Sequence, residues 1–208
     1  MGCGIPDMGF GYGIWRVEDP VKRGHTPVET DLTIKGKRMD YKYFISSLEN
    51  SAEKIRILLE GISKEQSKWK PNPEKWSILE VVNHLYDEEK DDFRKRLDLT
   101  LHKPEEEWPR IDPQGWVIAH EYSTKDFHQS VKNFFDERAK SIQWLINLSV
   151  PEWDTIHQHQ IIGPLSAADL LAAWAAHDYL HLKQISELQA GYLNILARPY
   201  STKYASPE

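Results

Sequence analysis

Apolar residues recur at helical spacing in four stretches of the chain, with polar residues between them. The stretches run from Phe44 to Ile62, from Ile78 to Leu97, from Phe127 to Ile146 and from Leu170 to Leu188. Within each, the apolar positions lie three, four or seven residues apart, which places them on one face of an α-helix. The pattern predicts four amphipathic helices of roughly 20–25 residues.

The boundaries of these stretches carry helix start and stop signals. Prolines, which disrupt helix interiors, fall between the four stretches. Ser77 and Glu80 have the spacing of a capping box, and Ser123 with Asp126 and Ser166 with Asp169 repeat it with the shorter acid. Alternating β-branched residues joined by Asn-Gly or Asp-Gly turns are absent, so no sheet is expected. The sequence therefore predicts an all-α four-helix bundle.

The chain divides into three parts by composition. Residues 1–38 are rich in glycine and have neither helical nor strand periodicity, so we expect a poorly ordered extension or leader. Residues 39–196 hold the four apolar stretches and form the predicted bundle. Residues 197–208 form a C-terminal tail.

Composition restricts the class of protein. The chain is 40% hydrophobic and 28% charged, which is typical of a globular domain. The net charge of -6 gives no reason to expect nucleic-acid binding, and no apolar run reaches the length of a membrane span. Cys3 is the single cysteine, so neither an internal disulfide nor a cysteine zinc site can form. We expect a cytoplasmic protein.

Two histidines in the fourth stretch, within the sequence AHDYLH, are candidate metal ligands. His177 and His181 share one narrow helical stripe with Trp174 and Ile185. Buried imidazoles need partners for their nitrogens, and a metal ion supplies one to each. The alternative is a pair of core histidines with ordinary hydrogen bonds, and spacing alone does not decide between the two.

A third ligand has to come from another helix. His84 lies on the flank of the second apolar stripe, and Glu88 is one turn further along the same line. His120, His157 and His159 fall in predicted loops and are weaker candidates. The acidic run from 88 to 92, together with Asp87, is typical of a solvated helix face.

The segments WSILEVVNHLYDEEKDDFRKRL (76–97) and LSAADLLAAWAAHDYLHLKQISEL (165–188) resemble the DinB superfamily. In that family a tryptophan opens the second helix, a histidine follows about eight residues later, and the fourth helix carries H-x-x-x-H. The resemblance implies an antiparallel four-helix bundle with one divalent metal ion, usually nickel or zinc. It implies His84, His177 and His181 as the metal ligands, and it suggests a homodimer formed through a helix face.

The histidine motif differs from the zinc-peptidase sequence HExxH by its aspartate. Asp178 is one methylene shorter than glutamate and points about 100° away from His177 on a helix, which argues against a peptidase. Three neutral ligands leave the full charge on the ion, which favours activation of a thiol or of water. The resemblance implies an enzyme that transfers a low-molecular-weight thiol, of the bacillithiol type, to a small electrophile.

Two further functions remain open from the sequence. One is a metal-dependent hydrolase, and the other is a non-catalytic stress protein that binds a metal or ligand. In each case Glu88 or Asp178 is a candidate to accept the second N–H of a ligand histidine.

Overall fold

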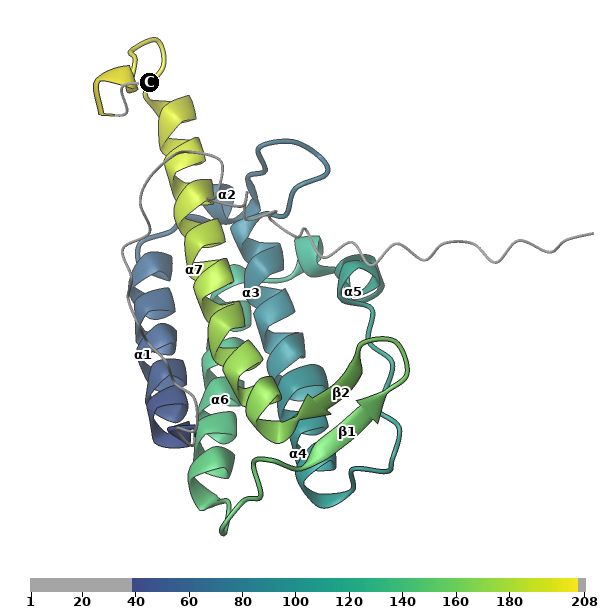
Figure 1. Cartoon of the computed structure of the whole chain (residues 1–208). Coiled ribbons are helices and arrows are strands. Elements are labelled where there is room, and N and C mark those ends of the chain that lie inside the picture. Colours follow the sequence, from purple (N-terminus) through teal and green to yellow (C-terminus); the bar gives the residue numbers. More distant parts are fainter. Residues whose placement is uncertain (1–38, 206–208) are drawn as a thin grey trace, which may run out of the picture. The chain divides into compact units, whose positions relative to one another are not determined.

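Four long helical segments form a bundle in residues 39–205, the part of the chain that this computed structural model describes (Figure 1). The predicted extension at 1–38 lies outside the described residues. In chain order the elements are α1 (Tyr41–Leu59), α2 (Lys64–Lys68), α3 (Ile78–Asp87), the π-helix η2 (Glu88–Phe93), α4 (Arg94–His102), α5 (Pro113–Ala119), the 3-10 helix η3 (Tyr122–Thr124), α6 (Phe127–Asn147), β1 (Ile156–His159), β2 (Gly163–Ser166), α7 (Ala167–Leu196) and the 3-10 helix η4 (Lys203–Ala205).

The bundle is built from α1, the continuous segment α3–η2–α4, α6 and α7. Figure 1 shows α1 and α7 running in one direction, while α3–α4 and α6 run in the opposite direction. The predicted all-α four-helix bundle is confirmed. Among the described helices, none combines the length and the apolar character that crossing a membrane requires.

Two of the three predicted helix caps are confirmed. The Glu80 side chain accepts from the Ser77 backbone N–H at 2.8 Å, and the Asp169 side chain accepts from the Ser166 backbone N–H at 2.8 Å, so both capping boxes are complete. The prediction for Ser123 is wrong. Helix α6 begins instead after Asp126, whose carboxylate accepts from the Gln129 backbone N–H at 2.9 Å.

The second bundle helix has a wide turn in its middle. Helix α3 passes into η2 and then into α4 without a break, and a π-helical stretch places one extra residue in a turn. This shift turns successive acidic residues inward, so Glu88, Glu89 and Asp92 are all buried, as is Asp87 before them. The prediction of a solvated acidic face is therefore wrong for these four residues.

Buried apolar side chains form two clusters, one at each end of the bundle. The first cluster joins α3 to the start of α6 and the later parts of α1 and α7, with Leu85 and Phe134 among its members. The second joins α4 to the end of α6 and the early parts of α1 and α7, and includes Leu97 and Trp174. Buried polar residues lie between the clusters on all four helical segments: Ser51, His84, Glu88, Glu89, Asp92, Arg138, Ser141, Asp178 and His181. We call this set the polar layer.

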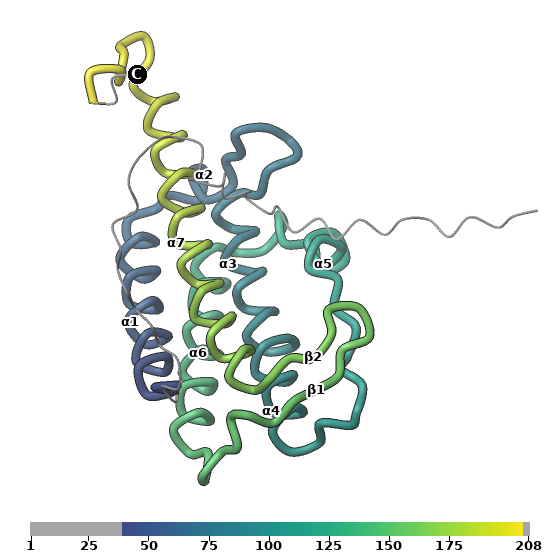
Figure 2. The backbone as a smooth tube through the Cα atoms, viewed as in Figure 1, coloured from purple at the N-terminus to yellow at the C-terminus, as the bar shows by residue number. Residues whose placement is uncertain are grey.

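A short hairpin precedes α7, contrary to the expectation of no sheet. Strands β1 and β2 pair in antiparallel register, with Ile156 opposite Ser166 and His159 opposite Gly163. The turn is closed by the His159 side chain, whose Nδ1 accepts from the backbone N–H groups of Ile161 and Ile162 at 3.2 Å each. In strands of only four residues, an alternation of apolar and polar side chains cannot be recognised from the sequence. The turn between them also lacks the Asn-Gly pair that would indicate a hairpin. Figure 2 shows the hairpin and α5 on the side of α3 that faces away from α1.

Candidate metal centre

The three predicted histidines meet in the polar layer. His84 comes from α3, and His177 and His181 come from successive turns of α7. The Nε2 atom of His177 lies 3.3 Å from Nε2 of His84 and 3.1 Å from Nε2 of His181. One ring nitrogen from each histidine lies within 4.8 Å of the other two, so the group has the form of a three-ligand metal site. His84 and His181 are buried, and His177 is half-buried.

The spacing of the nitrogens fits a bound ion. Histidine nitrogens lie about 2.0–2.1 Å from a metal, so two of them at angles of about 90–109° are separated by roughly 2.9–3.4 Å. The two nitrogen separations from His177, 3.3 and 3.1 Å, fall in this range. Ordinary hydrogen bonding accounts for the arrangement less well, because a neutral Nε2 either donates one proton or offers one lone pair. His177 Nε2 therefore cannot form a good N–H···N bond with each neighbour.

The outer nitrogen of His181 shows where its proton lies. His181 Nδ1 is 2.8 Å from the side-chain oxygen of Gln184. Because an amide oxygen only accepts, Nδ1 of His181 carries the proton and its Nε2 offers a lone pair. His84 Nδ1 faces Oε1 of Glu88 at 3.7 Å, and both atoms are buried without a hydrogen-bond partner.

Burial keeps the three imidazoles neutral, as metal ligation requires. Burial lowers the pKa of His84 and of His177 well below its ordinary value, and the neighbouring histidines add to the effect. Burial also lowers the pKa of His181. The adjacent Glu88 shifts in the opposite direction, because burial and the nearby Asp92 raise the pKa of its carboxyl to about 9.

Aromatic rings surround the histidines. The Trp76 ring lies 4.8 Å from the His84 ring, and the Phe93 ring lies 5.1 Å from the His177 ring. Phe93 in turn stacks on Trp174 at 5.6 Å. An apolar surround of this kind limits water access and strengthens electrostatic interactions at the site.

A buried ionic network supports α7 beside the histidines. Arg138 of α6 donates to both carboxylate oxygens of Asp178, at 2.6 and 2.7 Å, and to Oε1 of Glu89 at 2.8 Å. The Ser51 hydroxyl also donates to Asp178, and Trp174 Nε1 donates to Glu89 at 2.7 Å. Asp178 is thus fully engaged with Arg138 and Ser51, which leaves Glu88 as the carboxyl group facing a ligand histidine.

Arg138 and Gln184 were not predicted from the sequence. Arg138 stands four residues after Phe134 and four before Ile142, so it is a charged residue at a core position of α6. Gln184 follows His181 by three residues, which is a position where side chains on a helix meet. The partners of Arg138 lie on other helices and are brought close only by the fold, whereas Gln184 meets His181 within one helix.

The histidines of the predicted loops lie in other contacts. His120 Nδ1 is 2.7 Å from Asp87 Oδ2, and His157 Nδ1 is 2.8 Å from the backbone oxygen of Pro104. The Trp108 ring stacks on His157 at 4.3 Å, with His159 nearby. His120 thus joins the end of α5 to α3, whereas His157 joins the hairpin to the loop after α4.

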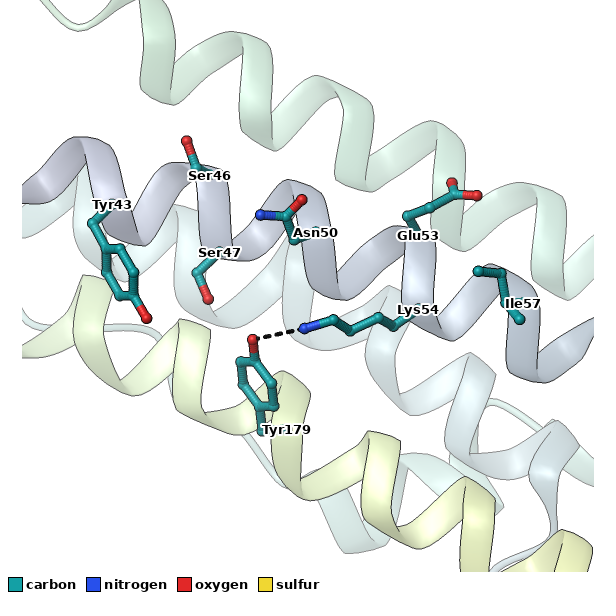
Figure 3. A pocket seen from close by; sticks show the side chains of 8 residues that line it. All are labelled: Tyr43, Ser46, Ser47, Asn50, Glu53, Lys54, Ile57 and Tyr179. Carbon is teal, nitrogen blue, oxygen red and sulfur yellow. Dashed lines mark hydrogen bonds between the residues drawn. The ribbon is translucent and has the colours of Figure 1, made fainter.

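An open surface pocket of about 490 Å³ lies on a different face, between α1 and α7. Figure 3 shows Lys54 of α1 donating to the Tyr179 hydroxyl at 3.1 Å, with Tyr43 and Asn50 also on the wall. The hydrogen bond from Lys54 lowers the pKa of Tyr179 below its ordinary value. None of the three clustered histidines lines this pocket.

Comparison with known proteins agrees with this architecture. A sequence model of the DinB superfamily matches residues 47–185, more than half of the chain, and the protein therefore belongs to the DinB superfamily. Among solved structures it is similar to YfiT from Bacillus subtilis, which is described as a probable metal-dependent hydrolase with an unusual four-helix bundle topology.

The YfiT superposition has a TM-score of 0.66 at 18% identity and covers 80% of this chain and 92% of that one. At this identity the similarity establishes the common fold. No curated protein matches the chain.

Proposed function

We propose that this protein is an enzyme that binds one divalent metal ion through His84, His177 and His181 and acts on a small-molecule substrate. The observation that carries the proposal is the convergence of three neutral ring nitrogens at metal-ligand spacing. Membership of the DinB superfamily and similarity to YfiT, described as a probable metal-dependent hydrolase, support a metal-dependent activity.

The residues of the chain prepare the site in two ways. Gln184 holds the proton of His181 on Nδ1, so its Nε2 lone pair faces the other histidines. Trp76 and Phe93 form an apolar surround. When bound, a divalent ion supplies Lewis-acid chemistry, which lowers the pKa of a water or thiol and makes it a nucleophile near neutral pH.

Two nucleophiles fit this proposal. Water gives hydrolysis, as in the description of YfiT. A low-molecular-weight thiol of the bacillithiol type gives transfer to an electrophile, and residues 39–208 contain no cysteine, so the thiol comes from a cosubstrate. Nickel and zinc are the ions we propose, because imidazole ligands suit both.

Metal analysis of purified protein tests the site. We expect about one ion per chain in the wild type. We expect that ion to be lost in each of the variants His84→Ala, His177→Ala and His181→Ala, because a site left with two of its three protein ligands holds its ion more weakly. The control is His102→Ala, which removes an exposed histidine at the end of α4. Full metal content in all three site variants would show that the ligand assignment is wrong.

Activity assays on the metal-loaded protein then separate the reactions. Consumption of thiol with an electrophile indicates transfer, and turnover of an ester or amide without thiol indicates hydrolysis. If the protein bound one metal ion per chain but catalysed neither thiol transfer nor hydrolysis, the enzymatic part of the proposal would be wrong, and the protein would be a metal-binding protein without turnover.

A further inference from the structure

We propose that Glu88 is the positioning residue for His84. Its Oε1 atom accepts the Nδ1 proton of His84 and thereby holds the Nε2 lone pair of His84 toward His177 and His181. This inference rests on the proposed metal site and adds to it a partner for the ligand that comes from α3.

The first observation is a pair of facing atoms that lack other partners. His84 Nδ1 and Glu88 Oε1 are both buried, and neither has a hydrogen-bond partner. They lie 3.7 Å apart, on side chains that are 5% and 6% exposed. A hydrogen bond between them needs a separation of about 2.7–3.2 Å, so less than an ångström of side-chain movement completes it. Buried polar atoms rarely stay unpaired, which makes each atom the natural partner of the other.

The second observation is that the Glu88 carboxyl is itself held in place. Glu88, Asp92 and Arg96 follow His84 at intervals of four residues along α3, η2 and α4. Glu88 shares a side-chain hydrogen bond with Asp92, and Arg96 Nε pairs with Asp92 Oδ1 at 2.9 Å. Arg96 also donates to the backbone oxygen of Pro109 at 3.2 Å. The successive contacts from Glu88 through Asp92 to Arg96 therefore hold in place the carboxyl group that faces His84.

The third observation is the matching arrangement on α7. There, His181 Nδ1 lies 2.8 Å from the side-chain oxygen of Gln184, one turn along the same helix. Glu88 lies one turn along from His84, and its carboxyl oxygen can accept a hydrogen bond as the amide oxygen of Gln184 does. Oε1 of Glu88 accepts whether or not the other carboxyl oxygen carries a proton. Two of the three ligands thus have an oxygen acceptor that fixes which nitrogen is free.

The test begins with the tautomer of His84 in the metal-free, full-length protein. Long-range ¹H–¹⁵N NMR distinguishes a protonated Nδ1 from a protonated Nε2. We expect His84 to carry its proton on Nδ1 in the wild type and in Glu88→Gln, which keeps an oxygen acceptor. We expect that preference to be lost in Glu88→Leu. A wild-type His84 with its proton on Nε2 would overturn the proposal without any variant.

Metal affinity is the second readout, measured by titration with cobalt(II) and its visible absorption. We expect Glu88→Leu to bind cobalt about 10–100-fold more weakly, the usual effect of removing such a partner, while Glu88→Gln stays closer to the wild type. The control is Asp91→Asn, on the same turn but half-exposed. Circular dichroism checks that each variant is folded.

The two proposals fail in distinguishable ways. If the tautomer depends on Glu88 but the wild type binds no cobalt, the metal site is wrong and the positioning contact stands. If Glu88→Leu is folded and binds cobalt with wild-type affinity, the positioning role is wrong and the metal site stands.

Discussion

Asp178 lies between two candidate ligands in the sequence but faces away from them in space. Its carboxylate is held by two nitrogens of Arg138 and by the Ser51 hydroxyl, and the side chain is fully buried. Glu89 occupies the other side of the same guanidinium, at 2.6 Å from Arg138 Nη2. The residue that makes AHDYLH similar to a peptidase motif therefore serves to fix α7 against α6 and α1.

Replacing Arg138 by methionine tests this network. The variant leaves the carboxylates of Glu89 and Asp178 buried without their cation, and breaking a buried pair in this way costs about 3–5 kcal/mol of unfolding free energy. Urea denaturation measures the loss. Lys132→Met is the control, because the Lys132–Asp136 pair is exposed and its removal should change stability little. Equal effects of the two substitutions would contradict a stabilising role for the buried network.

At the level of single residues, the sequence indicated which histidines lie together but not which side chains contact them. His177 and His181 could be found because a spacing of four places both on the apolar stripe of one helix. The contact of His84 with them required the packing of α3 on α7, which the family resemblance supplied and spacing alone does not. Glu88 was a candidate partner for a ligand, but nothing in the sequence separated it from Asp178, since the fold decides which carboxyl meets Arg138.

Among the elements, the connection between α4 and α6 is fastened to α3 through Asp87. The buried carboxylate of Asp87 accepts from the Tyr122 hydroxyl in η3, and His120 Nδ1 lies 2.7 Å away. Tyr122 is fully buried. One acidic residue at the end of α3 thus holds a segment that carries α5, which itself has no buried residue.

Because of this attachment, we expect the stability of the folded protein to fall at alkaline pH. Burial, and then the hydrogen bond and charge of Asp87, raise the pKa of Tyr122 far above its ordinary value. In the unfolded chain the phenol ionises near pH 10, so the stabilisation is complete below about pH 10 and is lost as the pH rises further. We expect the stability difference between wild type and Tyr122→Phe to shrink from pH 9 to pH 11, as measured by urea denaturation. A constant difference would show that Tyr122 does not ionise differently in the two states.

The elements that the sequence predicted are those with long apolar periodicity. The missed features are local: a hairpin of two four-residue strands whose turn is closed by His159, and the wide turn η2. Periodicity assumes a constant rise and rotation per residue, so an extra residue within a helix is invisible to it. The acidic run from 88 to 92 was predicted to face solvent because charged side chains are usually exposed, whereas four of the residues from 87 to 92 are buried.

In the whole molecule, the polar layer lies between two apolar clusters that each draw on α1, α6 and α7. Each cluster is large enough to pack these helices together on its side of the histidines. The bundle is therefore expected to fold around an empty site, unlike small domains whose folding depends on their metal.

Removal of the ion with a chelator tests this expectation. A ligand that binds only the folded state at 100 times its dissociation constant adds about 2.7 kcal/mol of stability. We expect the chelator to lower the melting temperature while the far-ultraviolet circular dichroism at 20 °C keeps its helical signal. The melting temperature of His84→Ala should not respond to the chelator. Loss of helix on chelation in the wild type would show that the metal, and not the two clusters, holds the bundle.

The wide turn η2 also restricts how this protein can change in length. If η2 keeps its wide turn, deleting one residue between His84 and Leu97 turns everything beyond the deletion by roughly 100° relative to α3, because an α-helix has about 3.6 residues per turn. Leu97 and Thr100, which are both buried, would then leave the interior. We expect insertions and deletions to be better tolerated in the loops after His102 and Asn147. The number of residues between His84 and Leu97 therefore fixes the rotation of α4 relative to α3, and with it which side chains of each half face the interior.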